Sequence, residues 1–97
     1  MLGIEPDYAD AHYKRGVAKN ASGDYQGAIN DFDKAIELVP DSATTYNNRG
    51  IAKRNLGSYQ DAINDFDKAI ELDPSYTTAR NNREWLLKDH KDHLSIK

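Results

Sequence analysis

Apolar residues recur at steps of three and four along two stretches of the chain. In the first stretch they are Ala28, Ile29, Phe32, Ala35, Ile36 and Leu38. In the second stretch they are Ala62, Ile63, Phe66, Ala69, Ile70 and Leu72. This spacing puts apolar side chains on one face of an α-helix and leaves polar residues such as Asp33 and Lys34 on the other. The pattern predicts two amphipathic helices, at about 25–38 and 59–72, and each must bury its apolar face against a neighbour.

These two stretches belong to a longer internal repeat. Residues 7–40 and 41–74 align without a gap, and the sequence AINDFDKAIEL occurs in both. Ahead of each amphipathic helix the repeat predicts another helix, at about 8–21 and 43–55. Glycine follows each of these, which suits a helix end, and proline follows each second helix, which it cannot extend. Each unit therefore reads as a helical hairpin.

Short polar residues stand where these helices are expected to begin. Asp24 and Ser58 precede the second helix of each unit, and Asp41 or Ser42 precedes the first helix of the second unit. A side-chain oxygen at such a position accepts from free backbone N–H groups. We expect these residues to be N-caps.

The chain resembles the tetratricopeptide repeat family, whose units are 34 residues long. Both units have the family's small, aromatic and proline positions, namely Gly16, Ala28, Phe32, Ala35 and Pro40, then Gly50, Ala62, Phe66, Ala69 and Pro74, with turn tyrosines Tyr25 and Tyr59. His12 departs from the aromatic found as Tyr46, and Lys19 and Lys53 replace a usual large residue. The resemblance implies an all-α solenoid of two hairpins plus a closing helix, wound as a right-handed superhelix.

The repeat divides the chain into four parts. Residues 1–6 resemble the tail of an upstream unit or are the start of the chain, and 7–40 and 41–74 are the two repeats. Residues 75–97 are expected to form a capping helix, from about 76 to 90 or beyond, and a tail. Leu86 and Leu87 are its candidate burying residues.

In this family the first helices line a concave groove, so the resemblance implies a peptide-binding surface there. Asparagine is a poor helix former, and its abundance on these helices favours a binding role over a merely solvated face. Tyrosine and tryptophan would add contact area, and the cations would favour acidic ligand groups. The candidate groove residues are Tyr13, Lys14, Val17, Asn20, Asn47, Asn48, Ile51, Arg54, Asn55, Asn81, Asn82 and Trp85, followed by Lys88.

Some family members clamp the C-terminal carboxylates of chaperones with lysine, asparagine and arginine. Of the five clamp positions only Asn48 matches here. Tyr13, Val17, Thr78 and Asn82 stand at the others. That class of ligand is therefore not expected.

Arginine recurs every 34 residues, as Arg15, Arg49 and Arg83. One interpretation is a basic ladder for phosphate or acidic peptides. Because Asp31 and Asp65 recur at the same period, ion pairs between hairpins are favoured, joining Arg49 to Asp31 and Arg83 to Asp65. A planar guanidinium suits such partly buried pairs.

Composition narrows the other classes of function. The chain has 97 residues, no cysteine and a net charge of −3, so thiolate chemistry is excluded and nucleic-acid binding is disfavoured. No catalytic pairing or phosphate loop is apparent, so we expect no enzyme activity and no cofactor. A metal at His90 and His93 is an alternative to a polar helix end, and no metal site is assigned. Without a signal peptide or transmembrane segment in this chain, the location stays unknown, with the cytoplasm as the default.

The sequence thus predicts a protein-interaction module that holds a peptide or protein segment of unknown identity. The alternative is a self-assembly scaffold. Two and a half units are few for a stable solenoid. Uncovered terminal faces could therefore meet a second copy.

Overall fold

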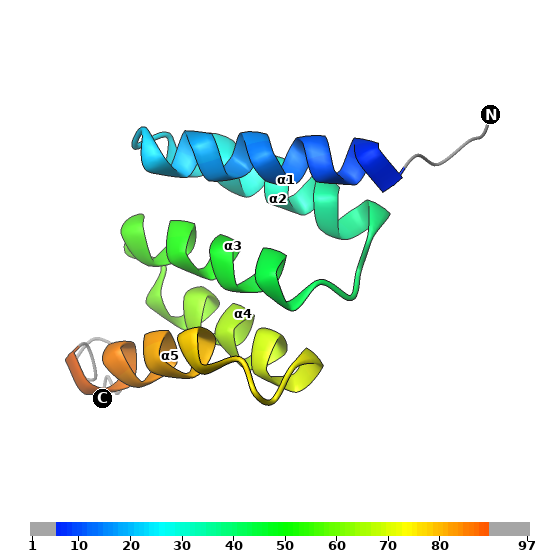
Figure 1. Ribbon diagram of the computed structural model, residues 1–97. Helices are drawn as coiled ribbons and strands as arrows, with labels where there is room; N and C mark the ends of the chain where they lie inside the picture. The colour runs from blue at the N-terminus through cyan, green and yellow to red at the C-terminus, as the bar shows by residue number, and fades with distance from the viewer. Residues whose placement is uncertain (1–5, 90–97) are drawn as a thin grey trace.

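The computed structural model describes residues 6–89, and that part of the chain consists of five helices (Figure 1). They are α1 (Pro6–Ala21), α2 (Tyr25–Leu38), α3 (Ala43–Asn55), α4 (Tyr59–Leu72) and α5 (Thr77–Asp89), with no strand among the described residues. The predicted bounds of α2, α3 and α4 are confirmed. The expected extension of α5 to His90 and beyond lies outside the described residues.

The turns form as the glycine and cap positions predict, with one exception. Gly23 and Gly57 have φ angles of 92° and 88°, a left-handed conformation that favours glycine. Asp24 Oδ1 accepts from Gly27 N at 3.0 Å, and Ser42 Oγ accepts from Thr45 N at 3.3 Å. Ser58 is the N-cap residue of α4, as predicted, but its side chain makes no cap hydrogen bond.

The Asp24 cap fits closely against Gly27. The Asp24 carboxylate fills the space that a Cβ at position 27 would take. In α4 the equivalent residue is Asp61, which carries a Cβ. A side chain at this position does not by itself prevent capping, since Ser42 makes its cap bond to Thr45 in α3.

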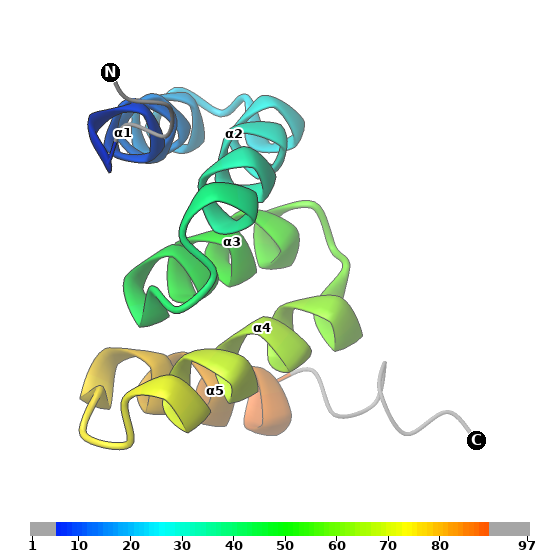
Figure 2. The same ribbon diagram turned by 90° about the vertical axis from the view of Figure 1, so that its right-hand side faces the viewer.

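The helices stack as antiparallel hairpins in two layers. Helices α1, α3 and α5 form one layer, and α2 and α4 form the other (Figure 1). Each helix packs on the next one along the chain, so the hairpins follow one another down the stack (Figure 2). This arrangement is an all-α helical-hairpin solenoid, as the repeat predicts.

The core consists of two equivalent clusters. Phe32 and Phe66 are both fully buried, each beneath a glycine of the preceding helix. A Cβ on Gly16 would lie 2.7 Å from Phe32 Cε1, and a Cβ on Gly50 would lie equally close to Phe66. Glycine therefore allows the two helices of each hairpin to approach closely.

Helix α5 closes the second cluster with one of its two candidate leucines. Leu86 is fully buried against Ala62, Ile63 and Phe66. Leu87 is 44% exposed, so its predicted burial is wrong. Consecutive residues point about 100° apart on a helix, and only one of them faces α4.

The repeated arginines form ion pairs, but with partners that differ from the prediction. Arg49 donates through Nε and Nη2 to Asp65 at 2.9 and 2.8 Å, within its own hairpin. It also donates through Nη1 to Asp33 of the preceding hairpin at 2.8 Å. Arg15 makes the equivalent pair within its hairpin, with Asp31. The predicted Arg49–Asp31 pair is therefore wrong.

Arg83 differs from the two other arginines. It donates to Asp67 at 3.1 Å, so the predicted pair with Asp65 is also wrong. Its buried Nε has no hydrogen-bond partner within residues 6–89. In Arg15 and Arg49 the same atom bonds an aspartate sixteen residues further along the chain.

Lysines also contact the two buried aspartates, Asp31 and Asp65. Lys19 Nζ lies 3.3 Å from Asp31, and Lys53 Nζ lies 3.2 Å from Asp65. Both lysines stand where the family usually has a large residue, so their departure from the pattern supplies a second cation to each buried carboxylate. His12 Nδ1 adds a contact to Asp31 at 3.4 Å.

Candidate functional site

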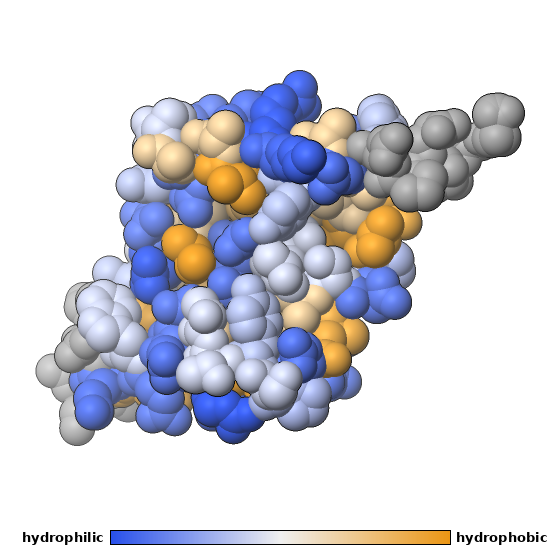
Figure 3. Space-filling model, viewed as in Figure 1, coloured by the Kyte–Doolittle hydropathy of each residue, from blue (hydrophilic) through white to orange (hydrophobic). Residues whose placement is uncertain are grey.

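The layer formed by α1, α3 and α5 presents one continuous surface, which we call the groove face. Figure 3 shows it as mostly polar, with small and separate apolar patches. All candidate binding residues lie on these three helices. The helices bring side chains more than thirty residues apart in sequence into direct contact.

A chain of hydrogen bonds crosses the groove face from α5 to α1. Asn82 Nδ2 donates to Asn47 Oδ1 at 3.0 Å, and Asn47 Nδ2 donates to Asn48 Oδ1 at 3.4 Å. Asn48 Nδ2 then donates to the Tyr13 hydroxyl at 2.9 Å. We call these four residues the hydrogen-bond chain, and every amide in it points its N–H toward α1.

The four residues of the hydrogen-bond chain differ in how far they are buried. Asn47 is only 2% exposed, so its amide joins α3 to α5 and cannot contact a ligand directly. Its predicted place among the groove residues is therefore corrected. Tyr13, Asn48 and Asn82 are half-buried, with one edge toward solvent.

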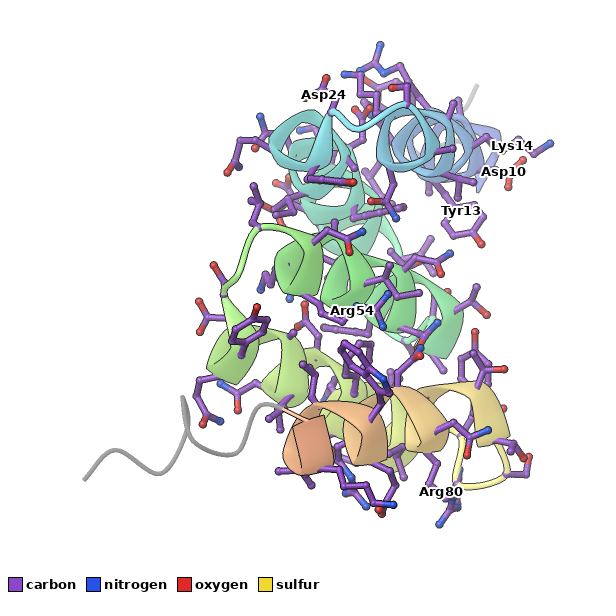
Figure 4. All side chains as sticks on the ribbon, turned by 90° about the vertical axis from the view of Figure 1, so that its left-hand side faces the viewer. Asp10, Tyr13, Lys14, Asp24, Arg54 and Arg80 are labelled. Carbon is purple, nitrogen blue, oxygen red and sulfur yellow. The ribbon has the colours of Figure 1, made fainter. Side chains whose placement is uncertain are left out.

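The Tyr13 ring lies at the α1 end of the hydrogen-bond chain. It borders a pocket of about 350 Å³ between α1 and α3, which we call the Tyr13 pocket. Figure 4 shows the Tyr13 side chain extending from α1 toward α3, below Asp10 and Lys14. The pocket is lined by Ala9, Asp10, Tyr13, Ala35, Val39, Ser42, Thr44 and Thr45. Apolar side chains and polar groups thus share one small concavity.

Burial and nearby charge change the acidity of the Tyr13 hydroxyl. Burial raises the pKa of Tyr13 above its usual value, and the negative charge of Asp10 acts in the same direction. The hydrogen bond from Asn48 opposes this and lowers the pKa, but burial is the larger effect. The hydroxyl therefore stays protonated at neutral pH.

At the other end of the groove face, a cation stacks on an aromatic ring. The guanidinium carbon of Arg54 lies 5.4 Å from the centroid of the Trp85 ring, which is a cation–π distance. Arg54 comes from α3 and Trp85 from α5. Trp85 is 47% exposed, so a large part of its surface faces solvent.

The other candidate residues fall into two groups. Lys14, Val17, Asn55, Asn81 and Lys88 are exposed, and Lys14 Nζ pairs with Asp10 Oδ2 at 3.1 Å. Asn20 is half-buried and its Oδ1 has no partner within residues 6–89. Ile51 is half-buried and packs on the second core cluster, so it serves the core as well as the surface.

Sequence reasoning did not single out Asp10, Thr44 and Thr45 as pocket residues. The sequence did contain a signal for Asp10 and Thr44. Asp10 lies three residues before Tyr13 on the same helical face, and Thr44 follows Asp10 by one repeat period. Thr45 is buried and gives no comparable signal.

No metal centre or membrane span is found in the described part of the chain. Residues 6–89 contain no group of three metal-ligating His, Asp or Glu side chains. The His90 and His93 pattern lies outside the described residues. None of the described helices is long and apolar enough to cross a bilayer.

Two family models match the sequence. A model described as tetratricopeptide repeat matches residues 43–76, and another described as TPR repeat matches residues 18–57, so together they span residues 18–76. A search of curated proteins finds no match.

Solved structures share the fold. The Arabidopsis OM64 TPR domain superposes with a TM-score of 0.85 at 25% identity, over 91% of this chain and 73% of that one. The TPR2B domain of yeast Sti1, solved in a pHsp70 complex, gives 0.83 at 28% identity, over 91% and 70%. The TPR2AB domain of yeast Sti1, solved in a pHSP90 complex, gives 0.86 at 28% identity over 95% of this chain, but the chain spans only 36% of that one.

By its stacked helical hairpins, the molecule is an α-solenoid repeat protein. The family matches and the structural neighbours then specify the kind of repeat: this chain belongs to the tetratricopeptide repeat family. Members of this family and fold are generally interaction modules and not enzymes.

Proposed function

We propose that the groove face binds an extended peptide segment of a partner protein. The hydrogen-bond chain is the observation that carries this proposal, because it joins α1, α3 and α5 into one preorganised surface that ends in a hydroxyl. Preorganised side chains lose less conformational entropy on binding. The structural neighbours from yeast Sti1, solved in complexes named for pHSP90 and pHsp70, support a peptide as the class of ligand.

Different residues of the groove face suit different parts of such a peptide. Exposed amides at Asn55 and Asn81 can both donate to and accept from an extended backbone. Arg54, stacked on Trp85, offers a cation beside an aromatic surface. An acidic or aromatic ligand side chain would fit this end.

A ligand that ends in a carboxylate is not the expected choice. At the positions of the family's carboxylate clamp, Tyr13, Val17, Thr78 and Asn82 supply no positive charge. The remaining clamp residue, Asn48, already donates to Tyr13. The partner is therefore expected to present an internal segment to this surface.

Fluorescence of Trp85, the only tryptophan, provides the test. A diverse library of internal peptides is titrated into the full chain, and we expect at least one to change the emission with saturation. Arg54→Ala should weaken that peptide about tenfold or more, since a charge-assisted contact is lost. Arg80→Ala is the matched control, because Figure 4 shows Arg80 on α5 pointing away from Arg54.

Two results would count against this proposal. One is that no peptide in the library gives a saturable response. The other is that Arg54→Ala and Arg80→Ala weaken the bound peptide to the same extent, which would indicate a nonspecific charge effect.

Self-assembly is the second candidate, and Arg83 is the observation that favours it. Its buried Nε–H has no acceptor within residues 6–89, whereas Arg15 and Arg49 use the same atom to hold an aspartate. A carboxylate from a second copy would satisfy that donor. Light scattering coupled to size exclusion tests this. A strict monomer at concentrations up to about 100 μM, which would reveal contacts of about −5.5 kcal/mol or stronger, would contradict it.

A further inference from the structure

The Tyr13 pocket has a chemical character that differs from the rest of the groove face. Its apolar lining residues are Ala9, Ala35 and Val39, and its polar groups are Asp10, the Tyr13 hydroxyl and the hydroxyls of the α2–α3 turn and the start of α3. No lysine or arginine is among the residues that line the pocket, and Lys14 on the same helix pairs with Asp10. A group that enters this pocket therefore meets one acid and several neutral hydroxyls.

The direction of the hydrogen-bond chain fixes what Tyr13 can offer. Because Asn48 donates to the phenol oxygen, the Tyr13 O–H is left to donate to something else. Asn48 is the only hydrogen-bond partner of that hydroxyl within residues 6–89. The pocket therefore presents a hydrogen-bond donor at Tyr13.

Asp10 offers the complementary function. Lys14 occupies its Oδ2 at 3.1 Å, and a carboxylate has further acceptor sites on both oxygens. Asp10 and Tyr13 are three residues apart on α1, so their side chains lie on the same helical face. The pocket therefore holds the Tyr13 donor and the Asp10 acceptor on the same face of α1, together with the apolar lining residues.

We propose that the Tyr13 pocket recognises an uncharged amide of the partner peptide. The amide oxygen accepts from the Tyr13 hydroxyl and the amide N–H donates to Asp10. The methylenes of the ligand residue rest on Ala35 and Val39. This inference rests on the proposed function, and it specifies which chemistry the α1–α3 end of the groove face selects.

Charge and hydrogen bonding argue against the other small polar groups. A carboxylate would face the charge of Asp10 with no unpaired cation beside it, and like charges at such a site are repelled. An ammonium group would suit Asp10 but would leave the Tyr13 O–H without an acceptor. An amide satisfies both residues, and it can come from a glutamine or asparagine side chain or from a backbone peptide unit.

Three small probes separate these sources, and NMR chemical shifts of the labelled full chain report their binding. They are the N-acetyl, N-methylamide derivatives of glutamine, glutamate and alanine. The glutamine probe should shift the backbone signals of Thr44 and Thr45 and the side-chain amide of Asn48. The glutamate probe should bind at least about fivefold more weakly. If the alanine probe matches glutamine, the backbone amide is the group bound, and if it is weaker, the side-chain amide is.

Two variants test the assigned roles. Tyr13→Phe removes the donor and should weaken the glutamine probe about two- to tenfold, the range for one neutral hydrogen bond. Asp10→Asn removes the negative charge and should abolish the preference for glutamine over glutamate. Equal binding of the two probes to the unmodified chain, or shifts that map away from the pocket, would overturn the proposal.

The test of the amide pocket can fail independently of the test of the proposed peptide binding. Peptide binding reported by Trp85 fluorescence, combined with indifference to Tyr13→Phe and to a glutamine-to-glutamate change in the peptide, would refute the amide pocket alone. Binding of the glutamine probe at the pocket, with no peptide that responds at Trp85, would refute the proposed groove function and leave the pocket assignment in place.

Discussion

The repeated arginines allow one kind of substitution to be compared in different surroundings. Arg49 makes three hydrogen bonds, two to Asp65 and one to Asp33, and its side chain is only 18% exposed. Arg83 occupies the same repeat position, but its partners are Asp67, which is 52% exposed, and Glu84 at 3.9 Å, which is 64% exposed. Replacing each arginine with alanine therefore removes the same atoms and different interactions.

The two costs can be estimated from the burial of the partners. Asp65 is 6% exposed, and removing one partner of a buried pair costs about 3–5 kcal/mol. Lys53 stays 3.2 Å from Asp65 and limits the loss, so we expect about 2–3 kcal/mol for Arg49→Ala. The exposed pair of Arg83 contributes about 0–1 kcal/mol.

Urea and thermal unfolding followed by circular dichroism measure this difference. In a domain of this size about 1 kcal/mol corresponds to roughly 4–8 °C, so Arg49→Ala should lower Tm by about 10–20 °C and Arg83→Ala by less than about 8 °C. Arg49→Lys is the control for charge, and it should recover only part of the loss because the two-pronged contact is gone. Equal effects of the two alanine variants would refute the assignment of Asp65 as the buried partner.

Three further predictions concern stability. The bonds from Arg15 hold the pKa of Asp31 below its usual value. The stability that Asp31 contributes is therefore fully present above about pH 4 and is lost as pH falls further. Asp31→Asn should flatten the acid side of the stability–pH curve, and an unchanged slope would contradict this. Gly16→Ala should cost about 1–3 kcal/mol of unfolding free energy, because the new Cβ meets the Phe32 ring. Glu84→Gly, at the same repeat position in α5, should cost only about 0.5–1 kcal/mol, and a larger loss there would refute the packing argument. His12→Tyr should stabilise the chain by about 0.5–1 kcal/mol in urea titrations, because it removes the buried Nε2, which has no partner within residues 6–89, and reproduces the Tyr46–Arg49 stacking at 5.4 Å. A less stable variant would show that the His12–Asp31 contact matters more.

The fold was predictable because its signals are local. Helix ends follow from Gly23, Gly57, Pro40 and Pro74, and core faces follow from apolar spacing. Ser58 begins α4 as predicted, although its side chain leaves the cap hydrogen bond unmade. Repetition made each of these signals appear twice, which strengthens the prediction of the hairpins.

The partners of the arginines and the pocket were not predictable in the same way. The sequence shows that Asp31 and Asp33 both recur, but a shift of two residues turns a side chain by about 200° around a helix. Which of them faces Arg49 depends on how one hairpin rotates against the next. The same rotation buries Asn47 while leaving Asn48 at the surface, although both are asparagines on one helix.

Arg49 bonds carboxylates of two hairpins at once, and this has a consequence for how the chain unfolds. In a linear array, total stability is a sum of the stability of each unit and of the coupling between neighbours. Because one guanidinium contributes to both quantities, its loss should weaken the second hairpin and also loosen its coupling to the first. The wild-type chain is then expected to unfold in a single cooperative step, whereas a chain without Arg49 would begin to unfold hairpin by hairpin.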